Sequence, residues 1–493
     1  MNSIGRACVV RTVGVICALI CCVGASTWAQ AAGKGQEKRP SAAPVVHALL
    51  ISDIHFEPFW DPAKVTQLEN IPATEWSKVL SAPPAADREA RFDRLQETCH
   101  ARGEDSSYRL YQSSLKAMQA DASDTKFVVV SGDLISHDFT CKFNTLVPDA
   151  KPGAYQAFVK KTIEFVMAEL HGAFQGVPVY AALGNNDSDC GDYRLDAGGK
   201  FLSTEAKEFT GGFVPADREQ AARDFAAGGY YSVGLPPPME HTRLLVLDDL
   251  FMSRRYATCG EKDDVSAAAS QIAWLEKELS EARKNHEMVW VMAHIPPGVD
   301  PFSTARKGPA LCMGAAPTMF LSSDALPEVL AKYGDVIRLA IFAHTHMDEV
   351  RWLAPPDDSA KQDGVAIKMV PSISPINGNN PAFTLATIDP ETAVMKDYRV
   401  IAASNDTGLD TKWAEEYDFE DAYKEPDFSA ATLQDLIGRF DSDRSAQTEA
   451  SQSYIRNYDV GQPVRELGPL WPAYVCALKN ETGAAFTSCL CGK

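Results

Sequence analysis

The stretch VVHALLISDIHFEP, residues 45–58, joins a short apolar run directly to a group of polar side chains. Residues 45–51 are mainly apolar, include three β-branched residues and have the length of one buried strand. The sequence Ser-Asp-Ile-His, residues 52–55, follows at once. A buried strand that ends in such residues is typical of an α/β protein, whose active sites gather at strand ends.

The same arrangement recurs along the chain. Further apolar runs of strand length occupy residues 127–130, 177–182, 244–247, 288–292 and 336–342. Four of them lead into polar groups, which are SGDLISHD (131–138), LGNND (183–187), AHIPPG (293–298) and AHTH (343–346). Segments with helical spacing of apolar residues lie between the runs, at 155–174 and 270–285. Strands that alternate with helices predict an α/β fold with parallel, buried sheets.

The later part of the chain has a different pattern. Apolar runs at residues 365–370, 382–388 and 393–401 follow one another without a helix between them, which predicts an antiparallel meander added to a mixed sheet. From residue 404 onward acids and aromatics crowd and the strand pattern ceases, while residues 432–440 and 451–458 have helical spacing. We therefore predict a C-terminal helical, cysteine-containing extension over residues 404–493.

Residues 1–31 have the pattern of a cleaved secretory signal peptide: basic residues, an apolar run at 13–25 and an Ala-x-Ala sequence at 29–31. The apolar run is shorter than the ~20 residues that span a bilayer, so we expect no stable membrane anchor. Residues 32–44 form a short linker. The protein is expected to be exported, either to a periplasm or into the medium.

Cysteine content and charge limit the classes of function. Four of the 12 cysteines lie in the signal peptide, and the remaining eight, an even number, favour disulfides whose pairing the sequence leaves open. The formal net charge of −19 opposes binding to nucleic-acid polymers. The 45% hydrophobic content is that of a folded globular protein, for which we expect a monomer.

Seven residues in the polar groups have side chains that bind divalent cations. Carboxylate, amide oxygen and imidazole together suit Zn²⁺, Mn²⁺ or iron better than Ca²⁺, with zinc the first choice. The Asp-x-His and His-x-His spacings place both side chains on one side of an extended chain. The sequence therefore predicts a site for two divalent metal ions, with the ligands Asp53, His55, Asp133, Asn185, His294, His344 and His346.

Each motif by itself is common and more often marks a surface turn or a hydrogen-bonded histidine. The motifs occur here in a fixed order, each directly after an apolar run, and this order favours the metal site. Gly132 and Gly184 precede Asp133 and Asn185, where the absence of a side chain lets the backbone turn tightly at a strand end.

The motif series resembles that of the calcineurin-like metallophosphoesterases, and the chain is most similar to their acid sphingomyelinase-like phosphodiesterase branch. The resemblance covers residues 45–423 and rests on the motifs SDIHFEP, GDLISHD, GGYYS, AHIPPG, HTHMDE and SISPINGNNPAF. It implies a four-layer α/β/β/α sandwich with mixed sheets, which we assign to residues 45–403.

The resemblance also implies how the ligands are divided. Asp53, His55 and His346 would bind one ion, Asn185, His294 and His344 the other, and Asp133 would bridge them. A hydroxide held between the metals would attack phosphorus in line.

Two positions depart from the family pattern. Ala343 replaces the usual glycine before His-x-His, and Asn186 occupies the place of a histidine associated with the leaving group. Asparagine donates hydrogen bonds but transfers no proton at physiological pH. We therefore hypothesise that His137 is the sole general acid, with Asp138 as its orienting partner; a loop histidine without a proton role is the alternative.

The function expected from these features is that of a phosphodiesterase acting on a small, soluble phosphodiester or nucleotide. A sphingomyelin-type lipid phosphodiesterase is one alternative, although the 13 residues of the linker leave no room for a lipid-presenting module. A metal-binding pseudoenzyme weakened by Asn186 is a second alternative. A disulfide-stapled structural domain is a third, which the order of the motifs disfavours.

Overall fold

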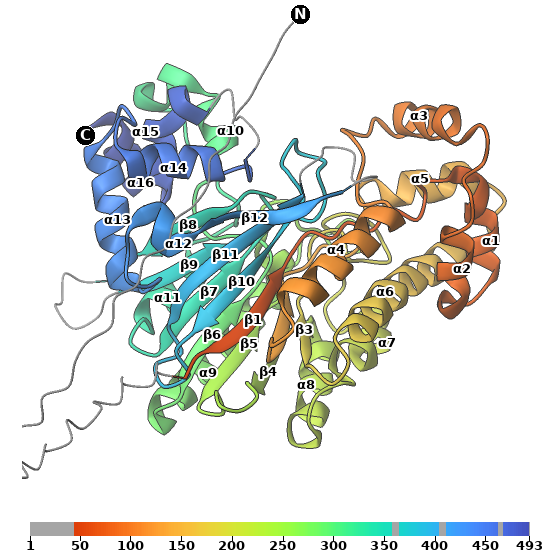
Figure 1. Ribbon diagram of the computed structural model, residues 1–493, viewed down its shortest axis with the longest axis horizontal. Coiled ribbons are helices and arrows are strands. Elements are labelled where there is room, and N and C mark those ends of the chain that lie inside the picture. The colour runs from red at the N-terminus through yellow and green to blue at the C-terminus, as the bar shows by residue number, and fades with distance from the viewer. Residues whose placement is uncertain (1–43, 357–363, 404–410, 462–466, 493) are drawn as a thin grey trace, which may run out of the picture. The chain divides into compact units, whose positions relative to one another are not determined.

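The computed structural model describes residues 44–356, 364–403, 411–461 and 467–492. Its core consists of two six-stranded sheets (Figure 1). The first sheet has the order β12 (Trp413–Asp418), β11 (Met395–Ala403), β10 (Ala382–Ile388), β1 (Val46–Ile51), β2 (Phe127–Val130) and β3 (Val179–Ala181). The second has the order β4 (Tyr231–Gly234), β5 (Thr242–Val246), β6 (Met288–Met292), β7 (Ile337–Phe342), β9 (Val365–Met369) and β8 (Glu349–Leu353).

Both sheets are mixed. In the first, β1, β2 and β3 are parallel and the strands from β10 to β12 add antiparallel pairs. In the second, the strands β5, β6, β7 and β9 are parallel and antiparallel strands lie at both edges. The ring of Phe127 on β2 packs 5.8 Å from that of Trp290 on β6, so the sheets face each other across an apolar interior. Carboxyl ends of parallel strands from both sheets can therefore meet at one edge.

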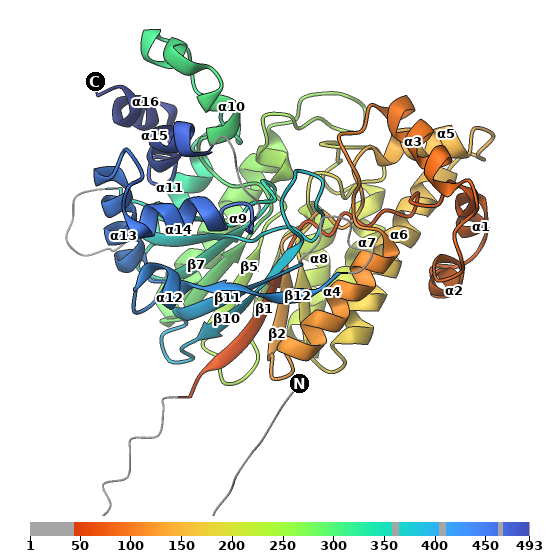
Figure 2. The same cartoon turned by 45° about the horizontal axis from the view of Figure 1, so that its top comes forward.

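Helices cover the outer faces of the two sheets and gather at one end of the second (Figures 1 and 2). In Figure 1, α4 and α6 cover the first sheet; the hydroxyl of Tyr111 on α4 donates to the carbonyl of Val166 on α6. The helices are α1 (Val65–Asn70), α2 (Trp76–Leu80), α3 (Arg88–Cys99), α4 (Tyr108–Asp121), α5 (Phe139–Leu146), α6 (Ala154–Ala173), α7 (Lys200–Thr210), α8 (Pro215–Gly228), α9 (Ser266–Asn285), α10 (Pro301–Ala305), α11 (Ala325–Lys332), α12 (Phe419–Tyr423), α13 (Ala430–Ser442), α14 (Glu449–Asn457), α15 (Leu467–Ala477) and α16 (Gly483–Cys491), with short 3₁₀ helices η1 (Pro62–Lys64), η2 (Ala73–Glu75), η3 (Asp249–Met252) and η4 (Gly308–Met313).

The predicted α/β class, the mixed sheets and the C-terminal helices are confirmed. The predicted meander is wrong in part, because β9 pairs with β7 and β8 in the second sheet while β10 and β11 lie in the first. An apolar pattern in the sequence indicates that a segment forms a strand, but it does not show which other strand it pairs with. The expectation that strands cease at residue 404 is also wrong, because β12 pairs with β11.

Four disulfides are present, although the sequence left their pairing open. They join Cys99 to Cys141, Cys190 to Cys259, Cys312 to Cys491 and Cys476 to Cys489. The last two fasten α15 and α16 to each other and to η4. Disulfides are typical of oxidising compartments outside the cytosol.

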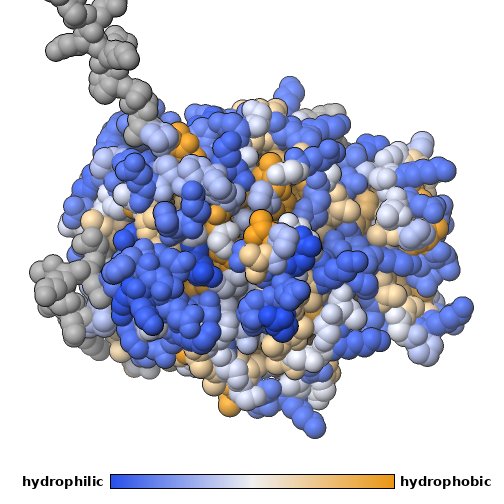
Figure 3. All heavy atoms as spheres, turned by 90° about the horizontal axis from the view of Figure 1, so that it is seen from below, coloured by the Kyte–Doolittle hydropathy of each residue, from blue (hydrophilic) through white to orange (hydrophobic). Residues whose placement is uncertain are grey.

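The predicted signal peptide and all but Pro44 of the predicted linker lie outside the described residues. Within the described part of the chain, no helix combines the length and apolar character needed to cross a bilayer. The face seen from below, where β1 begins, is mainly hydrophilic with hydrophobic residues scattered over it (Figure 3).

Candidate metal centre

The candidate ligands lie just beyond the carboxyl ends of strands from both sheets, where the backbone turns sharply. Five of them have a positive φ: 45° at Asp53, 43° at His55, 55° at Asp133, 71° at His344 and 68° at His346. This conformation is uncommon for residues with a side chain and costs ~1–3 kcal/mol at each position. Such strain is typical of sites whose geometry serves binding or catalysis.

Three of the ligands form a tight group. The Nε2 atom of His55 lies 3.2 Å from Nε2 of His346 and 3.7 Å from Oδ1 of Asp53, and the last two atoms are 3.4 Å apart. A tetrahedral ion with bonds of ~2.0–2.1 Å holds its ligand atoms about 3.3 Å apart. The spacing in this group therefore fits a metal ion.

Asp133 connects this group to a second one. Its Oδ2 atom lies 3.3 Å from Nε2 of His55 and 3.1 Å from Nε2 of His294. His344 joins Asp133 and His294 in a cluster whose ligand atoms lie within 4.8 Å of one another. Asn185 lines the same cavity as Asp133 and His344. The structure thus brings all seven predicted residues together.

Neighbouring groups fix the orientation of several ligands. The ring Nδ1 of His55 pairs with the carbonyl of Ile135 at 2.9 Å, and that of His294 with the carbonyl of Ser131 at 2.8 Å. A proton held at Nδ1 leaves Nε2 free to bind a metal. The hydroxyl of Ser52 donates to Oδ2 of Asp53 at 2.6 Å, which leaves Oδ1 of Asp53 for the metal.

The second group has its own supports. The amide Nδ2 of Asn185 donates to Asp192 at 2.7 Å, so its Oδ1 points away from that carboxylate. The hydroxyl of Tyr193 lies 3.2 Å from Nε2 of His344. Asp192 and Tyr193 adjoin in sequence, so one short loop supports two ligands.

Among the candidate ligand atoms, two oxygens, Oδ1 of Asp53 and Oδ1 of Asn185, are buried and have no hydrogen-bond partner among the described residues, and the same is true of Nε2 of His294. Buried polar atoms in folded proteins are nearly always paired. Bound cations would satisfy all three atoms, so the donor set and its unsatisfied atoms fit divalent metal ions.

Two glycines make the close approach of the loops feasible. Gly132 has a φ of 95°, and a Cβ there would lie 2.9 Å from Nδ1 of His294. A Cβ at Gly184 would collide with the carboxylate of Asp133. Both positions therefore require glycine, as expected from their place before Asp133 and Asn185.

The electrostatics divide the histidines into two kinds. Burial is the largest single effect and would lower the pKa of His294 and His55, but the nearby carboxylates, Asp133 foremost and Asp53 next to it, together outweigh burial and raise the two pKa values to about 10 and about 9. Burial lowers the pKa of His344 and His346 to about 3, assisted by positive charge on neighbouring histidines. Neutral imidazole is the form that binds a metal.

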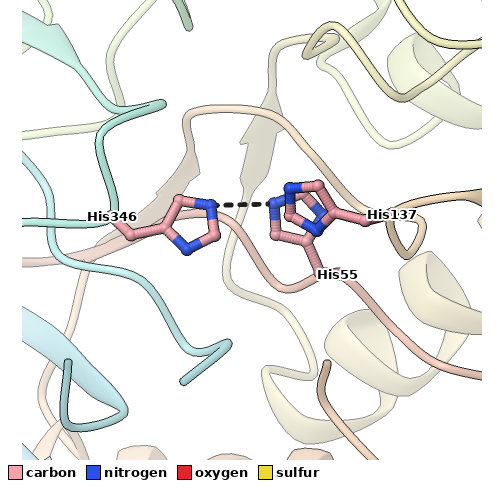
Figure 4. A group of neighbouring side chains, drawn as sticks. All are labelled: His55, His137 and His346. Atoms are coloured by element: carbon pink, nitrogen blue, oxygen red, sulfur yellow. Dashed lines mark hydrogen bonds between the residues drawn. The ribbon is translucent and has the colours of Figure 1, made fainter. Parts of the chain in front are cut away.

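His137 lies beside the first group (Figure 4). Its ring stacks on that of His55, with centroids 4.0 Å apart and planes 26° apart, and both rings face His346 in Figure 4. Its Nδ1 lies 3.1 Å from Oδ1 of Asp105, and its backbone N–H donates to Oδ2 of Asp105 at 2.8 Å.

The expectation that Asp138 orients His137 is therefore wrong, since Asp105 holds both the ring and the backbone. Asp138 instead precedes the first residue of α5 with a φ of 57°. Burial would raise the pKa of Asp105, but His137 and His55 hold it well below its ordinary value. A fixed negative charge thus faces the His137 ring.

Asn186 contacts Asp133. Its backbone N–H and its side-chain Nδ2 each donate to the Asp133 carboxylate at 2.9 Å, one to each oxygen. The same side chain is nine-tenths buried, with 6% of its surface exposed. In this position Asn186 orients the carboxylate that lies between the two groups.

A cavity of about 910 Å³ opens over the centre. Its lining includes Asp133, His137, Asn185, His344 and His346. Apolar side chains also line it, including Phe320 and three residues of the C-terminal helix α15, which are Leu467, Leu470 and Tyr474. Cavities of this size with convergent polar groups are typical of small-molecule sites.

Sequence reasoning missed Asp105, Asp192 and Tyr193. They lie in irregular loops with no fixed spacing to the motifs, so only the fold brings them to the centre. Asp187 was quoted as part of LGNND without a role; its carboxylate accepts the backbone N–H groups of Leu134, Ile135 and Gly184 and so ties the two central loops together.

The chain is similar to several known proteins. The model of the calcineurin-like phosphoesterase family matches residues 46–348. The acid sphingomyelinase-like phosphodiesterase 3b of Homo sapiens is 27% identical over 403 residues, covering 78% of this chain and 80% of that protein. The cyclic GMP-AMP phosphodiesterase SMPDL3A of Mus musculus is 24% identical over 400 residues, covering 78% and 82%. A solved structure, a dimetal phosphatase from Danio rerio, aligns with a TM-score of 0.40 and 14% identity over 73% of this chain and 95% of that chain.

Proposed function

The chain belongs to the calcineurin-like phosphoesterase family, and we propose that it is an exported phosphodiesterase that uses two divalent metal ions to hydrolyse soluble phosphodiesters or nucleotides. The family, together with relatives that are named phosphodiesterases, makes the chain a metal-dependent phosphoric ester hydrolase. Zinc is the first choice of metal, because imidazole and carboxylate predominate among the ligands.

One observation carries this proposal: six side chains of metal-binding chemistry gather around Asp133, and two of their buried oxygens have no partner among the described residues. Polar groups left unsatisfied in a protein interior are costly. Asp53, His55 and His346 would hold one ion and Asn185, His294 and His344 the other, with Asp133 between them.

When bound, two divalent cations supply a nucleophile from water near neutral pH and neutralise charge on the phosphoryl oxygens. The chain itself positions the reacting groups. His137 lines the cavity and delivers a proton to the departing oxygen from its Nε2 atom, while Asp105 holds its Nδ1 atom. Asn186 orients Asp133 and carries no proton.

The size of the cavity favours a soluble substrate over a lipid. Its volume of about 910 Å³ suits a small molecule rather than two long acyl chains. One of the relatives is named a cyclic GMP-AMP phosphodiesterase, which supports a nucleotide substrate. Four disulfides support export to an oxidising compartment. We further propose that residues 1–31 are the signal peptide. Residues 404–493 would form a C-terminal extension of the catalytic domain.

The test is a screen of phosphate esters with the purified, metal-loaded protein. We expect hydrolysis of bis(4-nitrophenyl) phosphate and of nucleotide diesters, loss of this activity with a chelator, and its return with Zn²⁺ or Mn²⁺. Sphingomyelin in detergent is the comparison substrate and should turn over more slowly. Hydrolysis that a chelator leaves intact, or a metal-loaded protein that cleaves none of the esters, would refute the proposal.

A further inference from the structure

Two adjacent arginines, Arg254 and Arg255, line the same cavity as the candidate ligands Asp133 and His344. Both belong to the segment that follows η3, and both side chains are exposed. Neither is a candidate metal ligand. In a chain of net charge −19, the two adjacent arginines place positive charge at the cavity.

The two arginines differ in how they are held. The guanidinium of Arg255 lies 4.0 Å above the ring of Tyr193 and 3.4 Å from Oδ2 of Asp192. The other carboxylate oxygen of Asp192, Oδ1, accepts the hydrogen bond from the side-chain amide of Asn185. The Arg254 guanidinium has no ion pair or hydrogen bond to any residue in the described ranges, so its charge is available to a ligand.

The segment that carries the arginines is braced on both sides. The disulfide between Cys190 and Cys259 ties it to the loop that follows Asn185. The backbone N–H of Arg254 donates to the carbonyl of Phe320 at 3.2 Å. The hydroxyl of Tyr256 donates to the carbonyl of Leu195 at 3.0 Å. A braced segment loses little conformational freedom when a ligand binds to it.

The contacts also set the distance from the metal ligands. The Tyr193 hydroxyl contacts His344 at 3.2 Å, and Arg255 lies over the face of the same tyrosine. The guanidinium of Arg255 and the candidate ligand His344 therefore contact the same tyrosine side chain, which puts the guanidinium beside the centre, within a distance that one sugar unit can span.

We propose that Arg254 and Arg255 form a subsite for a second phosphate of the substrate, one sugar unit from the phosphate that is cleaved. This inference rests on the proposed function and deepens it. Guanidinium groups bind phosphate by paired, charge-assisted hydrogen bonds. They repel the cationic head of a phosphocholine lipid, so the subsite selects nucleotides with two phosphates.

The experiment compares two esters that differ by one phosphate: thymidine 5′-(4-nitrophenyl phosphate) and the same ester with a 3′-phosphate. Both release 4-nitrophenolate from the same diester. We expect the metal-loaded protein to have a kcat/KM about 10-fold higher for the 3′-phosphorylated ester, mainly through KM. Added salt should reduce this preference, because the arginines are exposed.

The variant Arg254→Gln is expected to bring the ratio of the two kcat/KM values close to 1, and Arg254→Glu to bring it below 1. The matched control is Arg223→Gln on α8, which removes the same charge from an exposed arginine outside the cavity lining and should keep the preference. Hydrolysis of both esters at equal efficiency, or a preference that survives in Arg254→Glu, overturns the subsite and leaves the proposed function intact. If neither ester is cleaved, both proposals fall.

Discussion

Replacing Asp133 by alanine is expected to lower phosphodiester hydrolysis at least ~10³-fold, well beyond the ~10–100-fold that the loss of a residue supporting a metal ligand costs. The carboxylate lies 3.3 Å from His55 and 3.1 Å from His294, so its removal takes a shared ligand from both groups. The variant should also bind less metal. The measurements are kcat/KM for bis(4-nitrophenyl) phosphate and metal content after dialysis.

The control for this prediction is Asp300→Ala. Asp300 also lines the cavity, but its carboxylate accepts from the N–H of Ser303 at the start of α10 and has no place among the candidate ligands. The hydrogen bond from Ser303 to Asp300 caps the N-terminus of α10. Its loss should lower the free energy of unfolding by about 1 kcal/mol and leave hydrolysis within a few-fold of the native protein. Circular dichroism of Asp133→Ala separates a lost site from a lost fold. A folded Asp133→Ala protein that keeps its metal and its activity would contradict the assignment.

Replacing His137 by asparagine is expected to have an effect that depends on the leaving group. Esters with an alkyl leaving group should be cleaved ~10²–10⁴-fold more slowly, because the departing alkoxide needs a proton. Nitrophenyl esters should change little, because nitrophenolate leaves without one. The measurement is a plot of kcat against leaving-group pKa, which should steepen in the variant.

The variant Asp105→Asn tests the role of His137 through the residue that holds its ring. Asp105 contacts the Nδ1 atom and the backbone of His137, so it is a positioning residue. Its replacement should give a smaller loss with the same dependence on leaving group. Equal losses for alkyl and nitrophenyl esters in both variants would show that these residues support the structure and that His137 is not the acid.

Much of the fold follows from the apolar runs. The predicted bounds of β2, β6 and β10 agree with the structure, because these strands are buried along their length and are short, continuous apolar runs. β8 was missed because it contains Glu349 and Arg351, which are fully buried as an ion pair. A search for apolar runs does not detect a strand that contains charged residues. Glu349 and Arg351 can nevertheless lie in the interior because they pair with each other.

The site was more predictable at its centre than at its edge. Residues such as Asp53 and His346 lie within a few residues of the ends of β1 and β7, so topology alone brings them together. Asp105 lies between α3 and α4, and its contact with His137 depends on how that long connection folds. Asp138, the nearest acid in sequence, was a reasonable expectation and a wrong one, because a residue next to a histidine in a turn need not face its ring.

The most direct test of the two-metal centre is anomalous diffraction from crystals of the zinc-loaded protein. The account predicts two peaks about 3.5–4 Å apart, with Asp133 between them and the other six ligands divided three and three. A single peak, no peak, or two peaks away from Asp133 would contradict it.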